Sequence, residues 1–136
     1  MGHGGVFAAG PAVRELNALY DDLQVVLVND ADFGKKTAVC ESKKIEIHAG
    51  ERETSLMLYL HEELVKKELM AENDCVPDCP QSFLNHVPVC KISKTGAWGE
   101  PSLATKEKGE AIYRIKVDNM VEYARQAFEI SPKEAW

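Results

Sequence analysis

Hydrophobic positions recur at helical spacing in three stretches of the chain. In residues 10–23, Val, Leu and Tyr return every third or fourth position, and Pro11 suits the first helical position, where its missing N–H costs nothing. Residues 51–70 carry acidic groups early and lysines late, the order that the helix dipole favours. Residues 103–128 form one further helix, or two that meet near Gly109. These patterns predict the main helices of the fold.

Shorter apolar runs between these stretches predict strands. Residues 24–29 (QVVLVN) are almost wholly apolar and rich in Val, which is typical of a strand buried on both faces. Residues 43–48 (KKIEIH) alternate between polar and apolar, and residues 87–92 favour a further short strand. The rest of residues 71–101 is an irregular connection rich in Pro and Gly. A helix followed by a buried strand indicates an α/β fold.

Composition narrows the class of protein. The 136 residues are 45% hydrophobic and 28% charged, a balance that fits one compact globular domain. The net charge of −6 is spread along the chain, which argues against a nucleic-acid partner. No apolar run reaches the ~20 residues that cross a bilayer, so no membrane span is expected. The Gly-rich start lacks the features of a secretory signal, so we expect a cytoplasmic protein with reduced cysteines.

Two stretches offer side chains suited to chemistry. The first is GHGG at residues 2–5, directly before a helix, where His3 suits a metal and the glycines let a ligand approach closely; a mobile terminus is the alternative. The second follows the strand at residues 43–48. There His48 suits a general acid or base, and Glu51 or Glu53 suits a metal or a water, with capping of the next helix as the alternative.

A third stretch and the cysteines carry weaker signals. Residues 96–101 (GAWGEP) place Trp98 in a shaped loop before a helix, for which an ordinary turn is the alternative explanation. Cys75 and Cys79, with Cys90 nearby, fall within the loose spacing of zinc ligands, although isolated cysteines more often serve as small buried apolar groups.

The three stretches occur in the order GHGG, HAGERETSLML and GxWGEPxxATKEKGE, with a VVLVND run between the first two. From residue 2 to about residue 110 this order resembles the creatininase family of creatinine amidohydrolases and related formamide hydrolases. The resemblance implies a three-layer α/β/α sandwich around a mainly parallel sheet. It also implies hydrolysis of a non-peptide C–N bond in a cyclic amide or formamide. The implied cofactors are two divalent metal ions, zinc, manganese or iron.

The resemblance also assigns roles to residues of this chain. His3 matches a metal-binding His, and His48 matches a His beside the metals that assists proton transfer. Glu53 matches an acidic residue that contacts a metal or a water, so His48 and Glu53 are the expected catalytic residues. Asp32 and Trp98 fall in segments expected to bind the substrate. In the implied mechanism the metal pair activates a water that attacks the carbonyl carbon, and His48 passes a proton to the leaving nitrogen.

The sequence departs from the family pattern at its start. Met1 stands where relatives have Asn, and Val6 replaces the Asn that follows GHGG. Family chains are longer at the N-terminus, where they carry the first strands and most metal ligands. We therefore expect residues 1–136 to form a single creatininase-like domain, truncated at its N-terminus, with a small-molecule amide as substrate. We expect a homo-oligomer or a partner that supplies the missing N-terminal half. The alternative is an inactive structural or assembly module.

Overall fold

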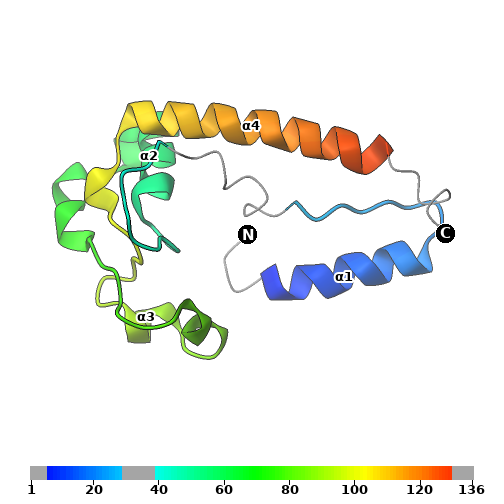
Figure 1. Cartoon of the computed structure of the whole chain (residues 1–136), viewed down its shortest axis with the longest axis horizontal. Helices are drawn as coiled ribbons and strands as arrows, with labels where there is room; N and C mark the ends of the chain where they lie inside the picture. The colour runs from blue at the N-terminus through cyan, green and yellow to red at the C-terminus, as the bar shows by residue number, and fades with distance from the viewer. Residues whose placement is uncertain (1–5, 29–38, 130–136) are drawn as a thin grey trace. The chain divides into compact units, whose positions relative to one another are not determined.

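The computed structural model describes residues 6–28 and 39–129, and Figure 1 traces its elements along the chain. The α-helices are α1 (Val6–Leu19), α2 (Glu51–Leu60), α3 (Val89–Ile92) and α4 (Lys106–Glu129). Short 3₁₀ turns connect them: η3 (Glu62–Leu64), η4 (Lys67–Leu69), η5 (Ala71–Asn73), η6 (Gln81–Asn85) and η7 (Pro101–Leu103). The chain divides into two compact units, one of Met1–Lys35 with Val117–Trp136 and one of Lys36–Lys116.

The first unit holds α1, the segment after it and the later turns of α4. Helix α1 begins and ends four residues before the predicted 10–23, so Pro11 lies inside the helix rather than at its first position. The proline has no N–H, so one backbone hydrogen bond of the helix is missing there. Asn17 pairs with the backbone of Val25 through two hydrogen bonds of 2.8 and 2.7 Å. The Gln24 amide donates to the carbonyl of Ala127 at 2.7 Å, which ties this segment to α4.

The predicted sheet is not confirmed by the part of the chain that the structure describes. Residues 24–28 run without a paired strand neighbour, and residues 43–48 form a single isolated bridge at their end. A strand requires a ladder of hydrogen bonds to a second strand, and the described residues offer these two runs no such partner. The prediction of a strand at residues 87–92 is wrong, because Pro88 precedes the short helix α3 there.

The second unit is built on the contact between α2 and the start of α4. Helix α2 begins at the predicted residue, Glu51, but ends ten residues before the predicted residue 70. A Cβ on Gly109 would lie 1.9 Å from the carbonyl oxygen of Ser55, so only glycine permits this approach of the two helices. The rings of Tyr59 and Tyr113 lie 5.6 Å apart beside it. Among the residues whose burial is described, the buried hydrophobic core consists of Leu58, Ala97, Trp98, Ala104 and Ile112.

No helix in the described ranges combines the length and the apolar character needed to cross a bilayer.

Candidate functional site

The structure brings together the two side chains that the sequence assigned to catalysis. Glu53 lies in the first turn of α2, and one of its carboxylate oxygens lies 3.6 Å from Nδ1 of His48, an ion-pair distance. The same oxygen accepts the backbone N–H of Ala49 at 2.6 Å. Both side chains are partly exposed, with 47% of His48 and 43% of Glu53 accessible. The pair therefore joins an imidazole to a carboxylate at an accessible surface.

Trp98 supports this pair through its backbone. Its carbonyl accepts the N–H groups of Ile47 and His48 at 2.8 and 3.2 Å, and its own N–H donates to the carbonyl of His48 at 2.7 Å. Its indole is buried, with 2% exposed, so among the described residues the ring belongs to the core. Ala49, the residue after His48, adopts a φ of +51°, which turns the chain sharply into α2. The substrate-binding role predicted for Trp98 stays a prediction.

Two other predicted site residues, His3 and Asp32, lie outside the described residues. Their roles, metal binding for His3 and substrate binding for Asp32, stay predictions.

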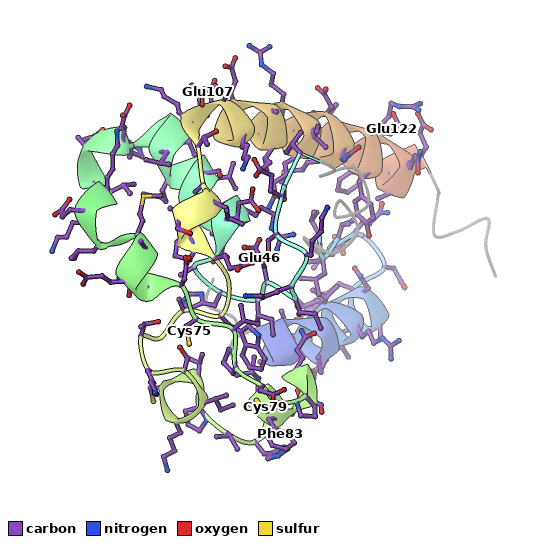
Figure 2. All side chains as sticks on the ribbon, turned by 60° about the vertical axis from the view of Figure 1, so that its left-hand side comes forward. Glu46, Cys75, Cys79, Phe83, Glu107 and Glu122 are labelled. Carbon is purple, nitrogen blue, oxygen red and sulfur yellow. The ribbon has the colours of Figure 1, made fainter. Side chains whose placement is uncertain are left out.

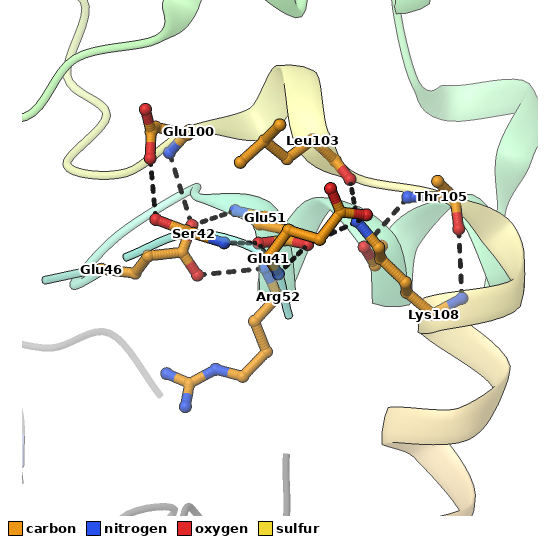
Figure 3. A network of polar contacts seen from close by, with 10 residues as sticks. Glu41, Ser42, Glu46, Glu51, Arg52, Glu100, Leu103, Thr105 and Lys108 are labelled. Carbon is orange, nitrogen blue, oxygen red and sulfur yellow. Dashed lines mark hydrogen bonds and ion pairs between the residues drawn. The ribbon is translucent and has the colours of Figure 1, made fainter. Parts of the chain in front are cut away.

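A buried ion pair joins Glu51, two residues before Glu53, to Lys108, and sequence reasoning missed it (Figure 3). The carboxylate of Glu51 is fully buried and accepts the ammonium of Lys108 at 2.6 Å. It also accepts the backbone N–H of Glu41 at 2.9 Å and that of Ser42 at 2.8 Å. Lys108 in turn donates to the carbonyl of Leu103 at 2.7 Å. The pair links α2, α4 and the segment before residue 43 at one point.

The environment of Glu51 keeps it ionised. Burial alone would raise the pKa of this carboxyl, but the hydrogen bonds from Lys108, Glu41 and Ser42 outweigh that effect and hold the pKa below its usual range. Glu51 was interpreted from the sequence as either a metal or water contact or a cap of α2. Its carboxylate instead bonds to other segments, and the sequence gives no signal for a partner 57 residues away.

One cluster among the described residues has the spacing of a metal site, but its chemistry does not fit one. The thiol of Cys40 and the carboxylates of Glu46 and Glu51 have ligand atoms within 4.8 Å of one another. The oxygens of Glu51 already bond to Lys108 and backbone N–H groups, and Glu46 accepts N–H groups at the start of α2. Burial and the two carboxylates raise the pKa of the Cys40 thiol. The cluster therefore reads as structural.

The zinc-module alternative for Cys75, Cys79 and Cys90 finds no support in the described part of the chain. All four cysteines are free thiols, and the metal-like cluster does not include Cys75, Cys79 or Cys90. Figure 2 shows Cys75 and Cys79 on separate parts of the irregular connection. Cys75 instead pairs through its backbone with Gly99.

The surface around His48 and Glu53 is shallow. Six residues line a depression there: Glu46, Ile47, His48, Gly50, Arg52 and Glu53. The depression encloses no volume that could hold a water molecule, so these residues do not by themselves form a substrate pocket. A wider and more open hollow of about 500 Å³ lies elsewhere on the same unit, lined by Tyr59, Leu60, Glu62, Glu63, Lys67 and Lys106. In that hollow Glu62 forms ion pairs with Lys67 and Lys106.

Comparison with known proteins identifies the class. The family profile described as "Creatininase: Creatinine amidohydrolase" matches residues 1–124. The chain therefore belongs to the creatininase family, a family of metal-dependent hydrolases.

Individual relatives agree with this assignment. The mycofactocin precursor peptide peptidase of Mycobacterium ulcerans (strain Agy99) is 31% identical over 122 residues, which are 88% of this chain and 44% of that protein. Two solved structures match with a TM-score of 0.68 and 30% identity: a creatininase mutant of the Zn-Zn type and a creatinine amidohydrolase (creatininase). Each match covers 90% of this chain and 50% of the other.

The chain thus spans about half the length of these relatives. The solved neighbours fit the α/β class that the sequence predicted, although the described residues form no sheet.

Proposed function

We propose that this chain carries the proton-transfer part of a metal-dependent amidohydrolase that cleaves a non-peptide C–N bond of a small cyclic amide or formamide. The observation that supports it is the pairing of His48 with Glu53 at 3.6 Å on an accessible surface. Membership of the creatininase family supports the reaction class.

The geometry favours a defined task for each residue. Glu53 faces Nδ1 of His48, so its negative charge stabilises an imidazolium as the ring takes up a proton. The hydrogen bond from the N–H of Ala49 holds the carboxylate in place. His48 then gives the proton to the leaving nitrogen as the C–N bond breaks.

The described residues do not make a two-metal centre by themselves, because each ion needs several protein ligands and Glu53 is the one predicted ligand among them. His3 is the second ligand proposed within this chain. When bound, the metal ions supply a water of lowered pKa and a Lewis acid for the amide oxygen. Further ligands would come from a complementing segment, as would the walls of a substrate pocket.

The test is hydrolysis of creatinine and related cyclic amides, with metal content measured on the same samples. The assay uses this chain and a version extended at its N-terminus by the upstream genomic sequence. We expect turnover in at least the extended version when zinc or manganese is bound. His48→Ala should lower kcat by about 10²- to 10⁴-fold, the usual contribution of a positioned acid or base.

His61→Ala provides a matched control. His61 also lies beside a carboxylate, with Nδ1 3.1 Å from Glu63, but on an exposed surface without the turn that holds Glu53. Its replacement should leave kcat unchanged. If both versions bind metal and fold but hydrolyse no amide, the chain is the inactive assembly module that remains the alternative.

A further inference from the structure

Glu46 joins three segments that meet beside the candidate catalytic pair. Its carboxylate accepts the backbone N–H of Glu51 at 2.5 Å and that of Arg52 at 3.4 Å, both at the start of α2. It also accepts the N–H of Glu100 at 3.4 Å, from the segment that leads into η7. Glu46 is partly buried, whereas Glu107 is exposed on α4, where Figure 2 shows it at the outer side of the helix. Glu46 itself stands two residues before His48.

Two glycines define the space that this carboxylate occupies. A Cβ on Gly50 would lie 2.5 Å from a carboxylate oxygen of Glu46 and 3.1 Å from Cα of Gly99. A Cβ on Gly99 would lie 2.5 Å from Cα of Gly50 and 3.1 Å from the same oxygen. The backbone at both positions therefore closes directly around Glu46, and a larger side chain at either would displace it.

Glu46 connects the two segments that carry the catalytic pair. On one side, the segment that carries Glu46 continues to His48, whose backbone is fixed by Trp98. On the other side, the N–H groups that it accepts belong to the first turn of α2, which carries Glu53. The N-cap residue, Gly50, provides no side-chain hydrogen bond to that turn, and the carboxylate of Glu46 accepts its N–H groups instead. Catalytic pairs tolerate only about 0.5 Å or 10–20° of misplacement.

We propose that Glu46 is a positioning residue: by clamping the first turn of α2 to the His48 segment, it sets the separation of His48 and Glu53. This inference rests on the proposed function, in which those two residues carry the proton transfer. Glu46 makes no contact of its own with the reacting atoms in that scheme. Its effect passes through the turn at Ala49, whose N–H meets Glu53.

The first test measures the amide proton of Ala49 by NMR on the full chain. A short bond to a carboxylate shifts an amide proton downfield, so Glu53→Gln gives the reference for its loss. Glu46→Ala should move the Ala49 resonance in the same direction by at least half as much, and Glu46→Gln by less. Glu110→Gln is the control, because Glu110 is an exposed acid on α4 paired with Arg114, and it should leave the resonance in place.

A role in stability alone would lower the melting temperature and leave the Ala49 resonance of the folded protein unchanged, and that result would overturn the inference. If Glu46→Ala does not fold, Glu46→Gln decides the question by the same comparison. In an active, extended version, Glu46→Gln should lower kcat by roughly 10-fold or more and leave KM unchanged, since misplacement acts on the chemical step. Absence of turnover in the unchanged protein would refute the proposed function, and the NMR result would still decide the role of Glu46.

Discussion

Replacement of Lys108 by Met tests the buried ion pair that holds α2 against α4. Met keeps most of the length and apolar volume of the lysine stem and removes only the ammonium group. In the native structure that ammonium donates to Glu51 at 2.6 Å, to Glu41 at 2.8 Å and to the carbonyl of Leu103 at 2.7 Å. The side chain of Glu51 is fully buried and that of Lys108 is 14% exposed, so water does not replace the lost donor at Glu51 without movement of the surrounding chain.

The expected cost follows from the groups left behind. Removing one partner of a buried pair costs about 3–5 kcal/mol, because the other charge stays buried without compensation. Here Glu51 keeps its hydrogen bonds from the backbone of Glu41 and Ser42, so we expect the lower end, about 3 kcal/mol. For a domain of this size that loss corresponds to a fall in Tm of about 10 °C. It is a large share of the ~5–15 kcal/mol that stabilises a typical domain.

Urea and thermal unfolding followed by far-UV circular dichroism measure this loss. Lys44→Met is the matched control: Lys44 also pairs with a carboxylate, that of Glu100, at 2.9 Å, but its side chain is 57% exposed. An exposed pair contributes about 0–1 kcal/mol, so this control should change little. If Lys108→Met costs no more than Lys44→Met, the burial argument for the Lys108–Glu51 pair is wrong.

Two further predictions concern helix packing and acid stability. Gly109→Ala should destabilise the protein by about 1–3 kcal/mol or more, because its Cβ would collide with a carbonyl of α2. The control is Gly10→Ala, whose Cβ meets nothing within 4 Å. It should stabilise α1 by about 0.5–1 kcal/mol in the same unfolding assay. Hydrogen bonds from Lys106 and Lys67 lower the pKa of Glu62 from 4.5 to about 2. The ionised carboxylate therefore stabilises the fold above pH 4.5, and this stabilisation is lost as the pH falls toward 2. Glu62→Gln should therefore melt below the unchanged protein at pH 6 and together with it at pH 2; a constant difference in Tm across this range would contradict the assignment.

The pattern of hydrophobic positions predicted the presence of the helices better than the residues at which they begin and end. The start of α2 follows from Gly50 and the acidic first turn, and the sequence placed it at the observed residue. Its end at Leu60 is unmarked, since residues 61–70 contain neither Gly nor Pro and the apolar spacing continues. Helix α4 starts three residues after the predicted position because Pro101 begins the separate turn η7. Strands were harder still, because an apolar run becomes a strand only when another segment pairs with it.

In the candidate site, too, the local contacts could be predicted from the sequence and the contacts between distant residues could not. The motif HAGERETS contains His48 and Glu53 within six residues, so the turn between them follows from local sequence, and the structure brings the two side chains together. The support of that turn comes from Glu100 and Lys108, about fifty residues along the chain. A single sequence records no trace of such contacts, and for this reason Glu46 and the Lys108–Glu51 pair were not predicted.

These contacts explain why a surface turn in a small core can hold two side chains in register. The first turn of α2 is fixed at its start by Glu46, and Lys108 of α4 binds Glu51 on that same turn. Ser55 lies one helical turn after Glu51 on α2, and its carbonyl packs against Gly109 of α4. This contact sets the separation of the two helices. Three independent constraints on one short helix leave it little freedom to rotate or slide. The geometry of His48 and Glu53 is therefore a property of the whole unit from Lys36 to Lys116, although the motif that carries it is local.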